Sequence, residues 1–454
     1  MTNATLPILT APPEHKYPPL RLDERTYDRA LACVHCGLCL PACPTFVATG
    51  HEADSPRGRI QLMRGLADGA IEASASVRHH LDLCLDCRGC ETACPSGVVY
   101  HELIEETRYR LRQKSMETVK PRKSARLMNW IFAKIFVYPR RLKLALLPVR
   151  ILQRIGIYGL MRKIGFFKLL PEGFQKMEQM LPPQGKLWPR RLPTLTPAQN
   201  RIAAKATVGF LGGCIGSVMF EKQNRQAVEL LSACGVDIFS PWRQTCCGAI
   251  AHHNGDWDRA RKFARKNIDR FMPENGVELK FITCNIAGCG SMLREYEHLL
   301  RDDAKYLTRA REFSSRVRDI SEVLLEMGLP PMTNRMDKTV TYHEACHLVH
   351  AQKVSAAPKS LLALVPGLKL VPLPEADMCC GAAGTYNLQQ PKMAGELADR
   401  KLRNIASTEA QTCVTGNVGC AMHIQSQASA HKQKINVVHP VELVHQAVFG
   451  KRES

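Results

Sequence analysis

The spacing of apolar residues divides the chain into a helical beginning and a long alternating remainder. Near the start, apolar residues recur at helical spacing, as Ile60 and Met63 do behind Ser55-Pro56, a typical helix start. From Lys205 onwards, short apolar runs alternate with amphipathic stretches. Alternation of this kind predicts strands and helices that assemble parallel sheets. The pattern therefore predicts a helical domain followed by α/β lobes.

The same pattern predicts the individual elements. In the helical part we expect helices over 24–32, 71–83 and 100–114, besides the one that begins at Pro56. The alternating part divides into two halves and a closing unit. We expect strands over 207–211, 236–239 and 281–284, then over 340–343, 368–372 and 413–416, and a last one over 435–438. The expected helices cover 221–234, 257–271, 358–364, 391–405 and 440–448.

Two cysteine runs of identical spacing mark the helical part. Each is C-x2-C-x2-C-x3-C-P, the spacing of bacterial ferredoxins that hold 4Fe–4S clusters. In two-cluster proteins the fourth cysteine of each run serves the other cluster. We therefore assign one cluster to Cys33, Cys36, Cys39 and Cys94, and the second to Cys84, Cys87, Cys90 and Cys43. Zinc favours paired C-x2-4-C with four ligands in all, and disulfides do not explain two copies of one spacing.

An internal repeat marks the alternating part. In each half a lone cysteine, a Cys-Cys-Gly triplet and a further cysteine follow one another at strand ends. The corresponding positions are 132, 133 and 131 residues apart. The two sets are Cys214, Cys246, Cys247 and Cys289, then Cys346, Cys379, Cys380 and Cys420.

These repeated cysteines are candidate metal ligands in loops. Adjacent thiolates can bridge neighbouring irons, and glycine lets the backbone approach a metal closely. Soft thiolates select iron–sulfur clusters, zinc or Cu(I), so one or two further Fe–S or zinc sites are expected. The alternative is that they are buried cysteines packing as small apolar residues. Cys234, Cys284 and Cys413 stand outside the pattern, and His253, His343 and His350 lie near the candidate ligands.

Composition indicates a cellular compartment and shows that the positive charge is concentrated in one segment. Nineteen cysteines in metal-type spacings favour a reducing cytoplasm. Neither a signal peptide nor a membrane-spanning run is expected from the sequence. The formal net charge of +20 is uneven, because residues 115–200 hold 17 Lys and Arg against 3 Asp and Glu. This segment predicts either a solvated basic face or a surface for anionic lipids on the inner face of the cytoplasmic membrane. No nucleic-acid-binding signature accompanies it.

Several stretches together carry a family resemblance. They are C-V-H-C-G-L-C (33–39), S-P-R-G-R-I (55–60), C-E-T-A-C-P-S-G-V (90–98), G-C-G-S-M-L-R-E-Y (288–296), H-A-Q-K (350–353) and C-C-G-A-A-G-T-Y (379–386). The chain resembles the CCG-domain iron–sulfur proteins, and among them the glycolate oxidase iron–sulfur subunits. The expected fold class is multidomain α and α/β: a helical two-cluster ferredoxin domain (21–114), a basic helical linker (115–200) and duplicated CCG lobes with parallel sheets (201–335 and 336–450).

The resemblance implies that this chain transfers electrons and that a partner subunit oxidises the substrate. Related chains work beside FAD-containing subunits that oxidise glycolate, D-lactate or glycerol 3-phosphate, and a quinone is the expected acceptor. The chain lacks the G-x-G-x-x-G dinucleotide fingerprint, in agreement with flavin on a partner. CCG repeats with a noncubane cluster end in C-x-x-C, but Ile286 and Asn417 stand at those positions here. A five-thiolate noncubane cluster is therefore not expected in either half, which leaves a four-thiolate cluster or a site completed by Cys284 or a histidine. This departure argues against disulfide reduction, the other function of such lobes, and leaves quinone reduction open.

Overall fold

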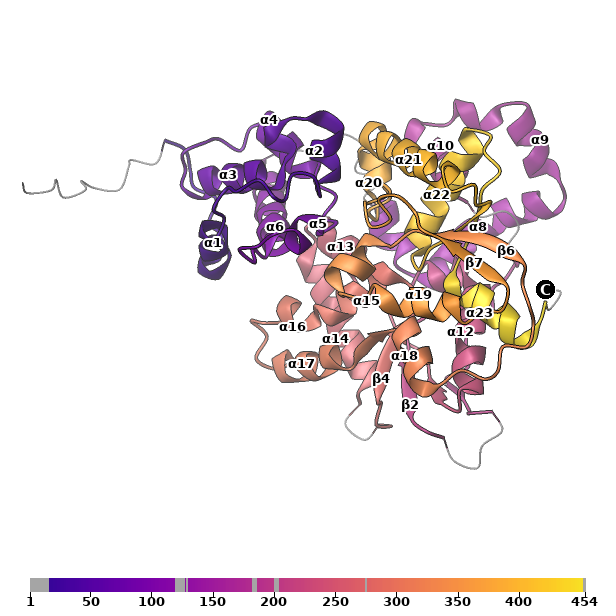
Figure 1. Ribbon diagram of the computed structural model, residues 1–454. Coiled ribbons are helices and arrows are strands. Elements are labelled where there is room, and N and C mark those ends of the chain that lie inside the picture. Colours follow the sequence, from indigo (N-terminus) through magenta and orange to yellow (C-terminus); the bar gives the residue numbers. More distant parts are fainter. Residues whose placement is uncertain are drawn as a thin grey trace, which may run out of the picture.

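The computed structural model describes residues 16–118, 127, 130–181, 186–199, 204–273 and 276–451. The predicted fold class is confirmed: a helical N-terminal domain lies beside two α/β lobes (Figure 1). The N-terminal helices begin at local signals. Asp23 accepts a hydrogen bond from Arg25 N at the first one, and Ser55 accepts one from Gly58 N at the third. The elements are α1 (Glu24–Leu31), α2 (Pro44–Thr49), η1 (Glu52–Asp54), α3 (Pro56–Ala67), α4 (Ala75–Asp82), α5 (Gly89–Thr92) and α6 (Tyr100–Thr118).

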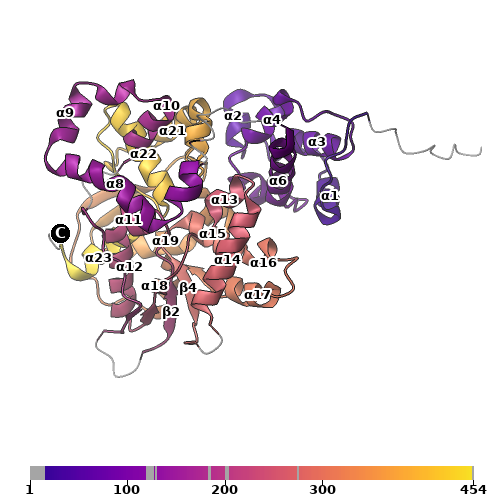
Figure 2. The ribbon, with the colours of Figure 1, turned by 180° about the vertical axis from the view of Figure 1, so that it is seen from behind.

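The linker packs on the back of the C-terminal half, where its magenta helices lie over the yellow ones (Figure 2). Its described elements are η2 (Phe132–Phe136), α8 (Pro139–Arg154), α9 (Ile157–Lys163), η3 (Phe166–Leu169) and α10 (Glu172–Gln179). Two of its basic residues are buried, against expectation. Lys143 Nζ donates to Pro189 O at 2.5 Å, and Arg150 donates to Lys186 O and Val218 O. Lys143 thus joins two parts of the linker, and Arg150 joins the linker to the first lobe, so neither buried cation can also face a membrane.

The first lobe is built on a sheet of order β1-β3-β2-β4-β5, parallel except for its edge strand β1. That strand, Leu195–Thr196, lies within the segment expected to be linker and pairs antiparallel with β3. The other strands are β2 (Thr207–Phe210), β3 (Asp237–Phe239), β4 (Phe281–Cys284) and β5 (Val317–Asp319). The helices are α11 (Gly216–Met219), α12 (Glu221–Ala233), α13 (Ala249–His253), α14 (Trp257–Phe271), α15 (Ala287–Arg294), α16 (Tyr296–Leu299), α17 (Leu307–Ser315) and α18 (Ile320–Met327).

The second lobe repeats the first. Its fully parallel sheet has the order β7-β6-β8-β9, which matches β3-β2-β4-β5 strand for strand. The strands are β6 (Lys338–Tyr342), β7 (Leu368–Val371), β8 (Thr412–Val414) and β9 (Asn436–Val438). The helices are η4 (His347–Ala351), α19 (Ala356–Ala363), α20 (Tyr386–Gln389), α21 (Pro391–Ala406), α22 (Val418–Ala430) and α23 (Pro440–Phe449).

The two lobes share one apolar core. Phe210 of β2 and Leu231 of α12 lie in the same buried cluster as Tyr342 of β6 and Leu362 of α19. The last helix, α23, contributes Val444 to that cluster and packs against both α12 and α19. The two repeated lobes therefore pack together as one unit. In each lobe the cysteine-bearing segments follow the carboxyl ends of the strands.

Among the described residues, no single helix has the length and apolar content to cross a membrane. The pair α8 and α9 would meet both criteria together, but the two helices are bent by 85° relative to each other.

Candidate iron–sulfur and metal sites

The first four-cysteine set lies near the surface of the helical domain. Cys33, Cys36 and Cys39 come from the loop after α1, and Cys94 comes from the second cysteine run. Together with Arg57 they line one cavity of about 290 Å³, open solvent included. Cys36 is exposed and the other three are half-buried. We call these four residues the outer set.

The second set lies deeper. Cys84, Cys87, Cys90 and the crossing Cys43 line a cavity of about 300 Å³, and three of the four are buried. We call them the inner set. All 19 cysteines lie in the described ranges and none forms a disulfide, so both sets offer free sulfur ligands. The two groupings are those that the crossed assignment requires, and each suits a four-thiolate cluster.

The two loops share an unusual backbone. His35 and Asp86, each just before the second cysteine of its run, both have φ near +54° or +53°. The residues just after that cysteine, Gly37 and Arg88, are left-handed as well. A non-glycine residue rarely takes this conformation, and its recurrence at equivalent positions indicates a functional constraint. The backbone therefore turns on both sides of the second cysteine, and the three cysteines of each loop line one cavity.

Hydrogen-bond donors surround the inner set. The Asp86 N–H group lies 3.4 Å from Cys84 Sγ, and the Tyr100 hydroxyl donates to the same sulfur at 3.7 Å. Arg59, whose side chain is almost fully buried, places Nη1 4.0 Å from Cys43 Sγ. Hydrogen bonds and positive charge near sulfur tune the reduction potential of a bound cluster. The inner set is thus electrostatically distinct from the exposed outer set.

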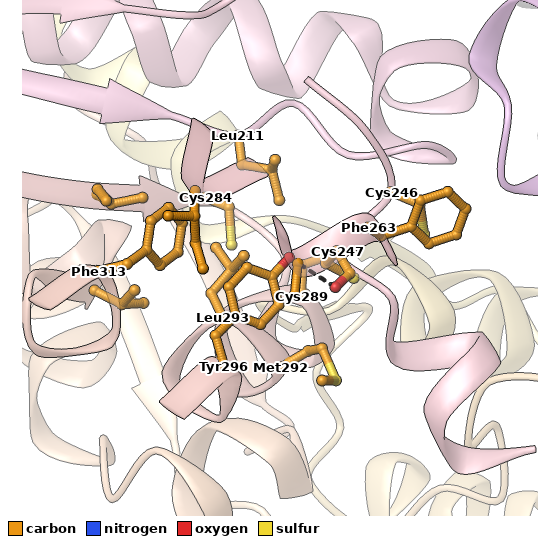
Figure 3. Packing of buried hydrophobic residues seen from close by; sticks show 14 of the residues in the cluster. Leu211, Cys246, Cys247, Phe263, Cys284, Cys289, Met292, Leu293, Tyr296 and Phe313 are labelled. Carbon is orange, nitrogen blue, oxygen red and sulfur yellow. Dashed lines mark hydrogen bonds between the residues drawn. The ribbon is translucent and has the colours of Figure 1, made fainter. Parts of the chain in front are cut away.

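The first-lobe set consists of Cys214, Cys246, Cys247 and Cys289, all buried. The sulfur atoms of Cys214 and Cys246 lie 3.5 Å apart, and those of Cys247 and Cys289 lie 3.3 Å apart. Tyr296 donates its hydroxyl to Cys247 O at 2.8 Å, the bond dashed in Figure 3. The sequence-based expectation of loops was wrong for Cys289, which lies in the first turn of α15.

The second-lobe set consists of Cys346, Cys379, Cys380 and Cys420, again buried. The sulfur atoms of Cys346 and Cys379 are 4.0 Å apart. Hydrogen bonds from Cys379 and Cys420 outweigh burial and, with His343, lower the pKa of the Cys380 thiol, which favours the thiolate that a metal needs. Cys420 lies in the first turn of α22, so the expectation of loops was wrong for this residue too, and Cys346 is the residue that precedes η4 as its N-cap.

The glycine of each Cys-Cys-Gly triplet allows a close approach. Gly248 (φ +101°) and Gly381 (φ +90°) are both left-handed. A Cβ on Gly381 would lie 2.7 Å from Ala394 O on α21, and one on Gly248 would contact the equivalent residue, Ala260, on α14. Glycine at these positions therefore lets each cysteine pair turn sharply beneath a helix.

Asn417 stands at the position where C-x-x-C repeats have a fifth cysteine. Its Nδ2 donates to Cys420 Sγ at 3.3 Å, so a hydrogen-bond donor stands where C-x-x-C repeats have sulfur. Ile286, at the same position of the first lobe, is a buried apolar residue. The three cysteines outside the pattern are buried thiols. Burial raises the pKa to about 11 for Cys234 and, in spite of opposing neighbours, to about 12 for Cys284 and Cys413.

The inner set adjoins the second-lobe set. Cys87 packs in one apolar cluster with Cys346 and Cys379, and burial together with the nearby Cys346 thiol raises its pKa. Tyr386 of α20 donates to Leu83 O at 2.9 Å and holds the two domains together there. The sequence placed these residues in separate domains and gave no sign of the contact. Three sulfur-lined sites consequently follow one another from the surface inwards.

A buried ionic network joins the helical domain to the first lobe. Arg88 pairs with Glu295 of the first lobe and with Glu105 of α6 at 3.4 Å. His253 contacts Asp86 at 2.9 Å and Glu105 at 3.3 Å. Sequence analysis noted His253 but not the carboxylates, which are brought together only by the fold.

The fold and these sites define a class: an iron–sulfur protein with a two-cluster domain and a duplicated cysteine-rich domain. The chain matches the description "4Fe-4S dicluster domain" over residues 29–98 and "Cysteine-rich domain" over 208–294 and 340–425. Residues 124–181 match "Glycolate oxidase iron-sulfur subunit, linker region".

Individual relatives identify the family within this class. The chain is 36% identical over 441 residues to the "Probable glycolate oxidase iron-sulfur subunit" of Bacillus subtilis, covering 95% of this chain and 96% of the relative. It is 33% identical over 420 residues to the "Glycolate oxidase iron-sulfur subunit" of Escherichia coli, covering 92% and 94%. A "Lactate utilization protein A" of Oceanobacillus iheyensis is 28% identical over 232 residues, 51% of this chain and 93% of the relative. The chain belongs to the family of glycolate oxidase iron–sulfur subunits.

Proposed function

We propose that this chain is the electron-transfer subunit of a flavin-dependent glycolate oxidase complex, in which FAD-containing partner subunits oxidise the hydroxyacid and a quinone receives the electrons. The row of three sulfur-lined sites carries the proposal: the outer set, the inner set and the second-lobe set. A 4Fe–4S cluster in each ferredoxin-type site would supply one-electron transfer. The residues of the chain would then hold the three sites next to one another and set the burial and the hydrogen bonds around each cluster.

The exposed loop of the outer set suits the docking of the flavoprotein. Val34 and Leu38 flank exposed Cys36, and their exposed fractions are 68% and 59%. Exposed apolar residues beside a cluster are typical of a protein contact, because burial of each contributes about 1.5–3 kcal/mol. Electrons entering here would have the shortest path to the outer set.

The experiment is purification of the complex with Val34→Lys or Leu38→Lys, scored by FAD and iron per chain. We expect FAD to be lost while iron is retained, because the charged side chain opposes burial without replacing a ligand. Leu364→Lys, which alters an exposed leucine after α19, is the control and should leave both contents unchanged. Retention of FAD by both loop variants would refute this docking site.

Substrate identity is tested on the assembled complex with a soluble dye as acceptor. We expect glycolate to support faster dye reduction than D-lactate or glycerol 3-phosphate. D-lactate is the second candidate substrate, because about half of this chain is similar to a lactate utilization protein. A preference for D-lactate would reject the glycolate assignment and keep the electron-transfer function.

Membrane attachment is the second part of the proposal, and the linker supports it. Exposed apolar side chains cluster on α8, α9 and η3: Leu144, Ile151, Ile155, Ile157, Leu160, Ile164, Phe166 and Leu169. Exposed Arg154, Lys163 and Lys168 lie among them. An interfacial surface combines these features, since apolar side chains enter the headgroup region and each cation contributes about 1 kcal/mol. The protein would then lie beside a lipid-soluble quinone on the cytoplasmic membrane.

Liposome sedimentation tests this attachment. The triple variant Leu160→Ser, Ile164→Ser and Leu169→Ser should abolish salt-sensitive binding to anionic vesicles and lower quinone-linked activity, with dye activity intact. Val277→Ser with Leu364→Ser, two exposed apolar residues outside the linker, should leave binding unchanged. Loss of the flavoprotein instead, with vesicle binding kept, would identify the surface as a protein contact and refute the membrane proposal.

A further inference from the structure

The two lobes differ at one position that faces the cysteines. The backbone N–H group of Leu211 donates to Thr283 O at 2.9 Å, and that of His343 donates to Val414 O at the same distance. The two residues therefore follow their strands, β2 and β6, at equivalent points. Figure 3 shows Leu211 above Cys284 and Cys289 in the first lobe. In the second lobe an imidazole takes the place of that apolar side chain.

The tautomer of His343 follows from its contact. Its Nδ1 lies 3.0 Å from Ala376 O, and a carbonyl oxygen can only accept, so Nδ1 carries the proton. The other nitrogen, Nε2, then presents a lone pair. The side chain is fully buried, and Nε2 has no hydrogen-bond partner among the described residues. Metal-binding histidines usually donate their second N–H to a carbonyl in this way.

A ring nitrogen of His343 lies close to sulfur, and Nε2 is the nitrogen left for a ligand because Nδ1 is engaged with Ala376 O. The ligand atoms of His343, Cys380 and Cys420 all lie within 4.8 Å of one another. Donor atoms around a single tetrahedral ion, bound at about 2.0–2.3 Å, are spaced in this range. A fourth donor is at hand, because Cys379 adjoins Cys380 and lies 4.0 Å from Cys346.

We propose that His343 Nε2 is a nitrogen ligand of a metal centre in the second lobe, completed by Cys380, Cys420 and a further cysteine of the second-lobe set. The first lobe, with Leu211 at this position, offers sulfur alone. Zinc and an iron of a cluster both accept imidazole with thiolate. If the centre holds iron, nitrogen ligation raises its potential above that of an all-sulfur site, as histidine does in Rieske centres. The centre would then draw electrons from the adjoining inner set.

The test measures metal and its ligand atoms in the full chain purified anaerobically with its partners. Iron, zinc and sulfide are counted per chain, and the bound metals are examined by X-ray absorption and by pulsed EPR with 15N-histidine labelling. We expect a nitrogen ligand in the wild type. His343→Leu, which copies the first lobe, should lose that signal and lower the metal content, while the EPR signals of the outer and inner sets remain.

His423 provides the matched control. It is another buried histidine of the second lobe, on α22, but both of its ring nitrogens have protein partners: Asn387 at 3.4 Å and Ala394 O at 3.2 Å. His423→Leu should keep the full metal content and the nitrogen signal. Should His343→Leu fail to fold, the presence or absence of a histidine nitrogen signal in the labelled wild type tests the proposal by itself. A wild type without a histidine nitrogen on its metals, or a folded His343→Leu with unchanged metal and nitrogen signal, would overturn the proposal.

Discussion

Replacing Arg59 by glutamine should lower the reduction potential of the cluster held by the inner set. The Arg59 side chain is 1% exposed, and its Nη1 lies 4.0 Å from Cys43 Sγ. A positive charge at this distance favours the reduced state, which carries one more negative charge. The variant removes that charge and keeps a polar side chain of similar length.

The size of the effect follows from two opposing contributions. A unit charge 4 Å away interacts by about 4 kcal/mol at an effective dielectric constant of about 20. Asp54, 3.8 Å from the guanidinium, offsets part of this charge, and the added electron is spread over a cluster whose centre lies beyond the sulfur. We therefore expect about 1–3 kcal/mol, which at 59 mV per 1.4 kcal/mol corresponds to a decrease of about 40–130 mV.

An EPR-monitored redox titration under anaerobic conditions measures this potential. Arg59→Lys, which keeps the charge, should shift it less than Arg59→Gln does. Arg57→Gln is the matched control: Arg57 is on the same helix but lines the outer cavity, and its side chain is more exposed. Solvent screening should make its effect on the outer cluster small. An unchanged or raised inner potential in Arg59→Gln, with iron content intact, would refute the reasoning.

Three further predictions concern the sites and their contacts. Cys94→Ser should abolish the EPR signal of the outer cluster and Cys43→Ser that of the inner one; loss from the sequence-neighbouring set would reverse the assignment. If both lobes hold iron, iron should exceed eight atoms per chain, and Cys247→Ala or Cys380→Ala should each lower it. Zinc in place of that iron would mark the lobes as structural sites. Burial alone would lower the pKa of His253, but nearby carboxylates raise it to about 10. Its unfolded-state pKa is about 6.5, so its stabilising contribution is complete below that pH and is lost as pH rises towards 10. Thermal melts should record this loss in the wild type and a flatter profile in His253→Gln.

The features that could be predicted from the sequence depend on the spacing of residues that lie close together in the chain. The two ferredoxin runs determine their own loops, and the bounds expected for α14 and β4 agree with those observed. The repeat offsets predicted two lobes with parallel sheets, and four strands of the first sheet have the same order as the four strands of the second. Each of these features depends on residues close together in the chain, or on a comparison of two similar segments.

Long-range packing accounts for what was missed. The contact of Cys87 with Cys346 joins segments more than 250 residues apart, and no local pattern encodes it. Lys143 and Arg150 looked like surface cations, but distant carbonyl groups accept their hydrogen bonds and allow burial. His343 could be noted in the sequence, but its free nitrogen is visible only beside the cysteines that other segments bring.

The position of α23 in the shared core has a consequence for biosynthesis. Val444 of α23 packs in the cluster that contains Phe210 and Leu231 of the first lobe, although it follows Leu231 by more than 200 residues. The apolar core of the first lobe is therefore incomplete until α23 has been synthesised. The helical domain has its own apolar core and can form while the rest is still being made. We expect delivery of metal to the nascent chain to occur in two stages, with the N-terminal sites first and the lobes only after α23 has joined the shared core.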